Sequence, residues 1–201
     1  DVDSDVLTAT GLANTSRNGG LVDNGNGTWT YTPAANDSGS VTFNYTISDG
    51  NGGTIAGSAT LDLTPVNDAP ATTPVTLAPF AEDSGPRLIT NAELTANASD
   101  VDGDVLTATG LAIARGNGAL VDNGNGTWTY TPAADDSSSV SFGYTIDDGN
   151  GGTIVGSATL DITPVNEPPT TTPVTLAPIA EDGGPRVITN AELVANAVDI
   201  D

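Results

Sequence analysis

Aspartates at alternate positions are the residues of this chain best suited to chemistry. Asp100-Val-Asp-Gly-Asp104 places three carboxylates within five residues, Asp1-Val-Asp-Ser-Asp5 is a near copy, and Asp199-Ile-Asp201 repeats its first part. Carboxylates this close repel one another unless a cation lies between them, and Ca²⁺ prefers oxygen ligands of this kind. The pattern therefore predicts calcium sites, and the alternative is a solvated acidic loop ahead of a strand.

The spacing argues against an EF-hand loop. If Asp100 is its first position, the sixth is Val105, where glycine is needed. The twelfth is Leu111, where a bidentate glutamate belongs. The EF-hand interpretation therefore fails, and a calcium site here would need another arrangement of ligands.

The composition excludes several classes of function. The 201 residues carry a net charge of −22, so nucleic acid and anionic membranes are poor partners, and no apolar run is long enough to insert into a membrane. The chain lacks His, Cys and Lys, which removes the usual acid–base and nucleophilic groups, and we expect no enzyme. Paired carboxylates for glycoside hydrolysis are the one catalytic arrangement that composition leaves open.

The sequence repeats with a period of 99 residues. Residues 1–102 aligned with residues 100–201 differ at 22 positions, several of them in the segment 14–20, as expected of a surface loop. Copies this similar should perform the same task, which favours an architectural role over catalysis.

Each repeat has the pattern of an all-β fold. Apolar residues alternate with polar ones in two segments joined by the turn 148–152, and Trp128 and Tyr130 alternate after the Asn-Gly pairs of 122–126. The alternating residues are Val140, Phe142, Tyr144 and Ile146 in the first segment and Ile154, Ala158, Leu160 and Ile162 in the second. About seven strands per repeat predict an immunoglobulin-like β-sandwich.

One short segment favours a helical turn. Thr90 and Glu93, repeated as Thr189 and Glu192, have the spacing of a capping box. The alternation of alanine and leucine over 92–98 leaves a strand as the competing interpretation.

Proline-rich segments at 65–70 and 164–169 predict the linkers. Residues 1–68 are then a partial repeat without its opening strands, 69–168 a complete repeat, and 169–201 the opening strands of the next one. One interpretation is a window of a longer tandem array. The alternative is an extracellular filament subunit, in which residues 169–201 complete the 1–68 domain of a neighbouring molecule.

Four motifs together resemble the cadherin-like tandem repeats of large bacterial RTX- and biofilm-type adhesins. They are Phe80-Ala-Glu-Asp83, the segment 98–104, the segment 144–152 and Pro164-Val-Asn-Glu-Pro-Pro169. The resemblance covers the whole chain. It implies a non-catalytic extender at the bacterial cell surface, which calcium between repeats rigidifies to project a distal adhesive domain. Its partners would be neighbouring repeats or identical subunits arranged head to tail.

The resemblance also implies which residues bind Ca²⁺. The first junction would use Asn67, Asp68, Asp100, Asp102, Asp104 and Asp148. The second would use Glu82, Asp136, Asn166, Glu167, Asp199 and Asp201, and Asp1 and Asp3 would belong to an earlier junction. Pro65 and Pro164 stand where the cadherin linker has aspartate, so we expect one or two ions per junction rather than three.

A glycan-binding module is a third interpretation, since Trp29 and Trp128 have faces on which sugars can stack. Each tryptophan alternates with a tyrosine in a predicted strand, and this pattern favours a place in the core instead.

Overall fold

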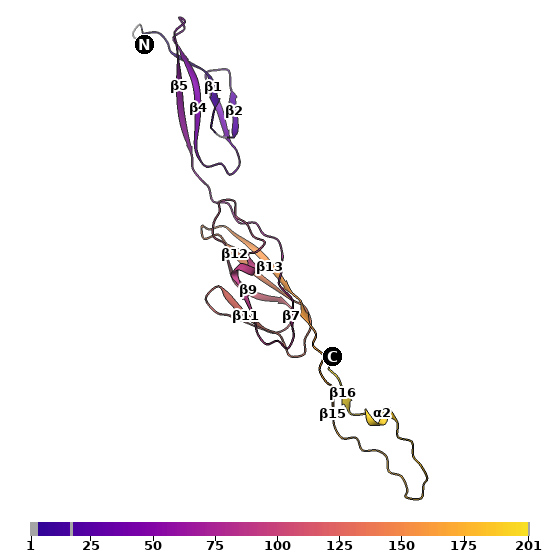
Figure 1. The fold of residues 1–201 in the computed structure, drawn as a ribbon. Helices are drawn as coiled ribbons and strands as arrows, with labels where there is room; N and C mark the ends of the chain where they lie inside the picture. Colours follow the sequence, from indigo (N-terminus) through magenta and orange to yellow (C-terminus); the bar gives the residue numbers. More distant parts are fainter. Residues whose placement is uncertain (1–3, 17, 201) are drawn as a thin grey trace. The chain divides into compact units, whose positions relative to one another are not determined.

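The computed structural model describes residues 4–16 and 18–200, and it divides into two compact units, Asp1–Asp68 and Ala69–Asp201 (Figure 1). Nearly all of the regular structure is β-strand, so the all-β prediction is confirmed. No helix in the described residues is long and apolar enough to cross a membrane.

The described residues of the first unit, 4–16 and 18–68, form five strands in two sheets. They are β1 (Thr8–Asn14), β2 (Gly19–Asp23), β3 (Trp29–Pro33), β4 (Gly39–Ser48) and β5 (Thr54–Leu63). One sheet has the order β1-β4-β5, and β2 pairs with β3 in the other. All of these pairs are antiparallel.

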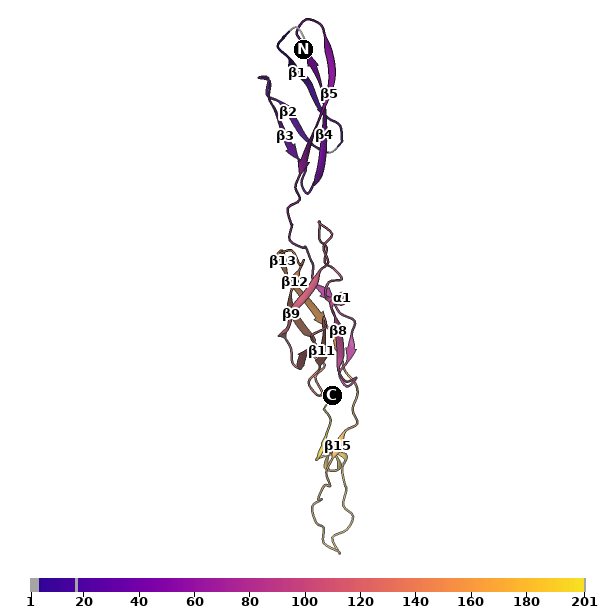
Figure 2. The ribbon, with the colours of Figure 1, turned by 90° about the vertical axis from the view of Figure 1, so that its left-hand side faces the viewer.

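The second unit contains the complete sandwich. Its strands are β6 (Val75–Thr76), β7 (Phe80–Ala81), β8 (Arg87–Thr90), β9 (Thr107–Arg115), β10 (Ala119–Asp122), β11 (Thr127–Thr131), β12 (Val140–Asp147), β13 (Thr153–Leu160) and β14 (Ile162–Thr163). Figures 1 and 2 show β12 between β9 and β13, in the sheet of order β6-β13-β12-β9. Opposite lies the sheet β10-β11-β8, and a short parallel pair joins β7 to β14.

The core of this sandwich lies on the inward faces of both sheets. The inward residues of β12 are almost fully buried, at every second position. Tyr130 and Phe142 meet from opposite sheets with their ring centroids 5.4 Å apart, nearly perpendicular, which is a favoured aromatic geometry. Trp128 is 3% exposed, so the prediction that it lies in the core is confirmed and its face is closed to sugars.

The opening segment of the repeat, residues 75–94, closes the sandwich through short contacts. β6 pairs with β13 in parallel and β8 pairs with β11. A helical turn, α1 (Asn91–Leu94), follows β8 and buries Leu94 completely. The Tyr144 hydroxyl donates a hydrogen bond to the Leu94 carbonyl at 2.7 Å, which ties α1 to β12.

The capping box predicted at Thr90 is confirmed, and the strand interpretation of 92–98 is wrong there. The Thr90 hydroxyl accepts from the Glu93 N–H, the Glu93 carboxylate accepts from the Thr90 N–H at 2.8 Å, and Arg87 lies 3.1 Å from that carboxylate. Partial burial acts to raise the pKa of Glu93, but the bonds from Thr90 and the charge of Arg87 outweigh it and the pKa is lowered.

Replacing Glu93 by Gln should therefore cost stability in a pH-dependent way. A carboxyl whose pKa is depressed on folding stabilises the native state above its unfolded pKa, about 4.3, and loses that contribution as the pH falls through the lower folded value. Wild type and Glu93→Gln should differ most at neutral pH and converge in acid, measured by urea unfolding. Asp122→Asn, which removes an exposed carboxylate that accepts a local bond from Gly124 N–H, is the control. A difference between wild type and Glu93→Gln that is independent of pH would contradict the role of the charge.

The remaining residues form β15 (Thr170–Thr171), α2 (Asn190–Leu193) and β16 (Ala197–Val198). β15 pairs with β16, and α2 has the same capping box as α1. The leucine of α2, Leu193, is 56% exposed, whereas Leu94 at the same place in α1 is buried.

Candidate metal centres

Three predicted aspartates converge at one end of the 69–168 sandwich. Asp100, Asp104 and Asp148 each offer a carboxylate oxygen, and these oxygens lie within 4.8 Å of one another. Asp100 and Asp104 belong to the loop before β9, and Asp148 follows β12. Residues 48 positions apart in the sequence thus meet because β9 and β12 are neighbours in one sheet.

Local hydrogen bonds fix how these carboxylates point. Asp100 Oδ1 accepts from the N–H of Asp102 at 2.8 Å, so the loop folds around it. Asp148 is 3% exposed, and its Oδ1 accepts from Asn150 N–H and Gly152 N–H at 2.8 and 2.9 Å. These hydrogen bonds therefore hold one oxygen of Asp100 and one oxygen of Asp148, and they orient the rest of each carboxylate.

Two oxygens of this cluster are buried without a hydrogen-bond donor. Asp100 Oδ2 and Asp104 Oδ2 have essentially no solvent contact and no hydrogen-bond partner. Two unit charges 4 Å apart repel by about 4 kcal/mol at an effective dielectric constant of about 20, and buried unpaired acceptors add a desolvation cost. A divalent cation would relieve both costs, and hard carboxylate oxygens are the donors that Ca²⁺ takes. The residues therefore fit a calcium ion.

The first unit repeats part of this arrangement. Asp49 occupies the position of Asp148 one period earlier, and its Oδ1 accepts from Asn51 N–H and Gly53 N–H at 2.8 and 2.9 Å. Asp1 and Asp3, predicted to belong to the same kind of site, lie outside the described residues, as does Asp201.

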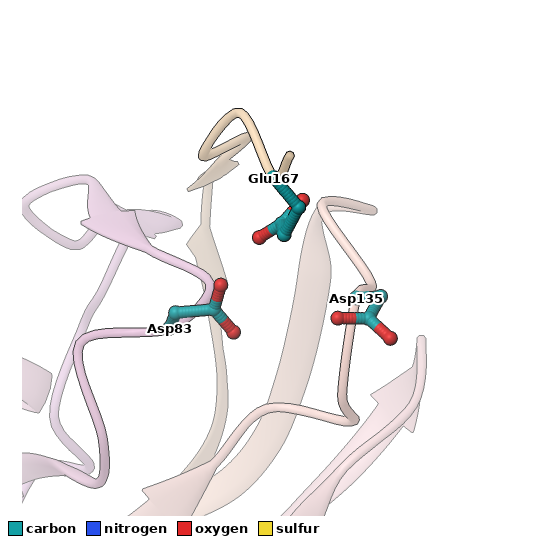
Figure 3. Close-up of side chains that lie close together, drawn as sticks. All are labelled: Asp83, Asp135 and Glu167. Atoms are coloured by element: carbon teal, nitrogen blue, oxygen red, sulfur yellow. The ribbon is translucent and has the colours of Figure 1, made fainter. Parts of the chain in front are cut away.

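A second acidic group lies at the other end of the sandwich. Asp83, Asp135 and Glu167 come from three separate segments and face a common space (Figure 3), with oxygens within 4.8 Å of one another. Asp135 has φ of +54°, in the left-handed region that aspartate and asparagine tolerate better than most residues. Asn36 has the same conformation one period earlier, so the loop geometry belongs to the repeat.

Two predicted ligands of this region have other contacts. Glu82 is buried, and its Oε1 accepts from the Val165 N–H at 2.8 Å, which holds the linker against the end of β7. Asp136 accepts from Asn117 Nδ2 and Ser138 N–H, and hydrogen bonds from these two residues lower its pKa. Their sequence neighbours Asp83 and Asp135 face the common space instead. A pocket of about 120 Å³ beside it is lined in part by Glu82, Asp135 and Glu167.

The other predicted residues lie outside these two groups. Asp102 is exposed and joins the first cluster through its backbone. Asn166 is exposed and its side chain donates to the Glu167 carbonyl at 3.1 Å. Asp199 is exposed, and Asn67 and Asp68 belong to the first unit.

A protein-family model that covers most of the chain identifies the family. The model of the cadherin-like domain matches residues 1–64 and 66–163, and the chain belongs to this family. Cadherin-like domains are extracellular, non-enzymatic modules, and cadherin domains in general bind calcium. No curated protein matches the sequence.

Solved structures share the fold at low identity. The chain is 16% identical to extracellular cadherin domains 1–5 of protocadherin gamma B2, with a TM-score of 0.51, covering 89% of this chain and 37% of that one. Human mucin-like protocadherin EC1-2 gives 15% identity and a TM-score of 0.47, covering 79% of this chain and 85% of that one.

An endo-fucoidan hydrolase of glycoside hydrolase family 107 gives 20% identity and a TM-score of 0.35 over 81% of this chain. The chain spans about a quarter (24%) of that enzyme's length. These likenesses describe the fold alone.

Proposed function

We propose that this chain is a non-catalytic, calcium-binding extender of a bacterial cell-surface adhesin. Each repeat is a rigid sandwich, and Ca²⁺ at the ends of the repeats stiffens the chain so that it projects a distal adhesive domain. The observation that carries the proposal is the cluster of Asp100, Asp104 and Asp148, with two buried carboxylate oxygens that have no hydrogen-bond donor.

The position of the cluster supports a role at a joint. It lies in the loops 99–106 and 148–152, and Ala71, directly after the predicted linker 65–70, forms a β-bridge with Ser99 beside Asp100. Three carboxylates supply only part of the 6–8 oxygens that calcium takes. The linker residues Asn67 and Asp68 are our candidates for further ligands, together with Asp102 and water. The acidic group Asp83, Asp135 and Glu167 would serve the next joint, with Asn166 and Asp199.

Electrostatics supplies the mechanism. Without a cation, the carboxylates at each joint repel one another, and the linker is free to bend. With calcium bound, oxygens from the loops and linker share one ion, so the joint has fewer conformations. A net charge of −22 draws divalent cations to the molecule and keeps neighbouring molecules apart.

A purely structural role also agrees with the composition. The chain has no His, Cys or Lys, and its aspartates recur in both copies at turns, where they orient the backbone. We assign residues 1–68, 69–168 and 169–201 to three successive repeats of one architecture.

Small-angle scattering of residues 1–201 with calcium and with EGTA tests this proposal. Calcium should increase the radius of gyration and narrow the distribution of shapes, because a stiff joint keeps two repeats extended. Asp104→Asn should weaken the response, whereas Asp122→Asn, which makes the same charge change in the exposed turn after β10, should retain it. Identical scattering curves with and without calcium would refute the calcium-stiffened joint.

A further inference from the structure

The chain contains eight asparagines that are followed directly by glycine, a pair in which the side-chain amide can convert to an acid. They are Asn18, Asn24, Asn26, Asn51, Asn117, Asn123, Asn125 and Asn150. The backbone nitrogen of the glycine attacks the side-chain carbonyl carbon, a C–N bond forms, and the amide nitrogen leaves as ammonia with the proton of the attacking nitrogen. Water then opens the five-membered imide at either carbonyl, which gives aspartate or isoaspartate. Glycine favours the reaction because it has no side chain to obstruct the ring.

Hydrogen bonds restrain the two pairs in the hairpin turn between β10 and β11. Asn123 Nδ2 donates to the Thr127 hydroxyl at 3.0 Å. The N–H of Gly124, which would have to attack, donates to Asp122 Oδ1 at 2.8 Å. The Thr127 hydroxyl also donates to Asn125 Oδ1 at 2.7 Å. These hydrogen bonds must break before the ring can close, so both pairs should react slowly.

Four further pairs are restrained in similar ways. Asn24 and Asn26 have the same side-chain bonds to a threonine one period earlier. Asn117 Nδ2 donates to Asp136 Oδ2 at 2.8 Å. Asn18 directly precedes β2, whose backbone is fixed by its pairing with β3.

The pair of Asn150 and Gly151 has neither kind of restraint. In the part of the chain that the structure describes, the Asn150 side chain and the Gly151 N–H have no hydrogen-bond partner, and both residues are exposed. Beyond the chain neighbours of Gly151, no atom lies within 4 Å of the position that a Cβ would take there, so the ring has room to close. The same is true of Asn51 and Gly52 in the described residues of the first unit.

We propose that Asn150, and Asn51 one period earlier, are the sites at which this chain converts to aspartate and isoaspartate, with water as the only co-reactant. The position of Asn150 gives the reaction a consequence. Asp148 Oδ1 accepts from the N–H groups of Asn150 and Gly152 at 2.8 and 2.9 Å. Isoaspartate adds a methylene carbon to the backbone between those two donors, so one oxygen can no longer meet both in the same geometry. The turn that orients Asp148 toward the first candidate metal centre is therefore altered.

Mass spectrometry of residues 1–201, kept folded at mildly alkaline pH, tests the proposal. After cleavage at arginine, fragmentation by electron transfer reads each asparagine separately and distinguishes aspartate from isoaspartate. Acid should accumulate at Asn150 and Asn51 about tenfold faster than at Asn123, the ratio that one or two ordinary hydrogen bonds can produce. In urea the hydrogen bonds are lost, and the sites should convert at similar rates. Equal rates at Asn150 and Asn123 in the folded protein would overturn the proposal.

Thr127→Val tests whether hydrogen bonding is the cause of the selectivity. The substitution keeps the branched shape of the side chain and removes the hydroxyl that holds Asn125. The rate at Asn125 should rise toward that at Asn150, while the rate at Asn150 stays unchanged. An unchanged rate at Asn125 would contradict the role of the hydrogen bond.

The effect on calcium rests on the proposed function and is measured separately. Ion exchange isolates the converted molecules, in an Asn51→Ser background so that only the turn 148–152 changes, and Asn150→Asp supplies the same charge without the longer backbone. The isoaspartate form should bind Ca²⁺ about tenfold more weakly than Asn150→Asp, since residues that orient a ligand influence affinity on this scale. Equal affinities would overturn the effect on the turn. If wild type binds no calcium, the proposed function fails and the conversion at Asn150 still stands.

Discussion

Calcium is expected to raise the unfolding temperature of the 69–168 sandwich by about 6 to 20 °C. Extracellular calcium modules have dissociation constants of about 10⁻⁴ to 10⁻³ M, so about 10 mM free calcium would stabilise the folded state by about 1.4 to 2.7 kcal/mol per site. For a domain of about 60 to 100 residues, each kcal/mol corresponds to about 4 to 8 °C. Trp128 fluorescence, in a Trp29→Phe background, follows the transition of this unit alone.

The variant Asp148→Asn tests whether the cluster of Asp100, Asp104 and Asp148 is the source of this stabilisation. The amide oxygen can still accept from Asn150 N–H and Gly152 N–H, so the turn is preserved while one buried charge is removed. Without calcium the variant should unfold at the same temperature as wild type or higher, since the repulsion from Asp100 and Asp104 is relieved. With calcium it should unfold at a lower temperature than wild type.

The substitution should therefore leave the unfolding temperature unchanged or raise it without calcium, and lower it with calcium. A general effect of charge cannot produce this dependence on the metal. Asp122→Asn should follow wild type in both conditions, because Asp122 is exposed and accepts only a local bond from Gly124 N–H. A calcium shift of equal size in wild type and Asp148→Asn would exclude the cluster as the binding site.

The strands that alternate over many residues could be predicted from the sequence, and the short ones could not. Val140 to Ile146 gave a clear period of two, and the capping spacing of Thr90 and Glu93 gave the helical turn. The strands β6, β7 and β14 have two residues each, too few for any period to appear. Their pairing depends on tertiary contacts, of β6 with β13 and of β7 with β14.

The two candidate metal centres show a similar limit. The alternating aspartates of 100–104 and the repeated turn at 148–152 allowed the ligands of the first group to be predicted, because each pattern lies within a short segment of the sequence. In the second group, the sequence has Glu82 beside Asp83 and Asp135 beside Asp136, and it does not tell which of each pair faces the common space. The structure turns Glu82 to the linker backbone and gives Asp135 a positive φ, and both effects are tertiary or conformational. Adjacent acids in one segment were the available signal for Asp83 and Asp135.

Ile89→Ala should destabilise the same sandwich by about 2 to 5 kcal/mol, the usual cost of truncating a fully buried isoleucine. Ile89 is 0% exposed and pairs with Trp128, although it belongs to the short strand β8. A large loss would mean that the opening segment is part of the core and that a unit without it is markedly less stable. Urea unfolding followed by Trp128 fluorescence, in the Trp29→Phe background, gives the loss as a shift of the midpoint at constant slope.

Two matched substitutions separate core packing from the intrinsic preference for strand. Leu88→Ala changes the neighbouring residue, 53% exposed on the opposite face of β8, and should cost no more than about 0.5 kcal/mol. Ile188→Ala repeats the change in residues 169–201, where the side chain is 51% exposed, and should leave the Trp128 transition unchanged. Equal losses for Ile89→Ala and Leu88→Ala would mean that β8 contributes strand pairing but little burial.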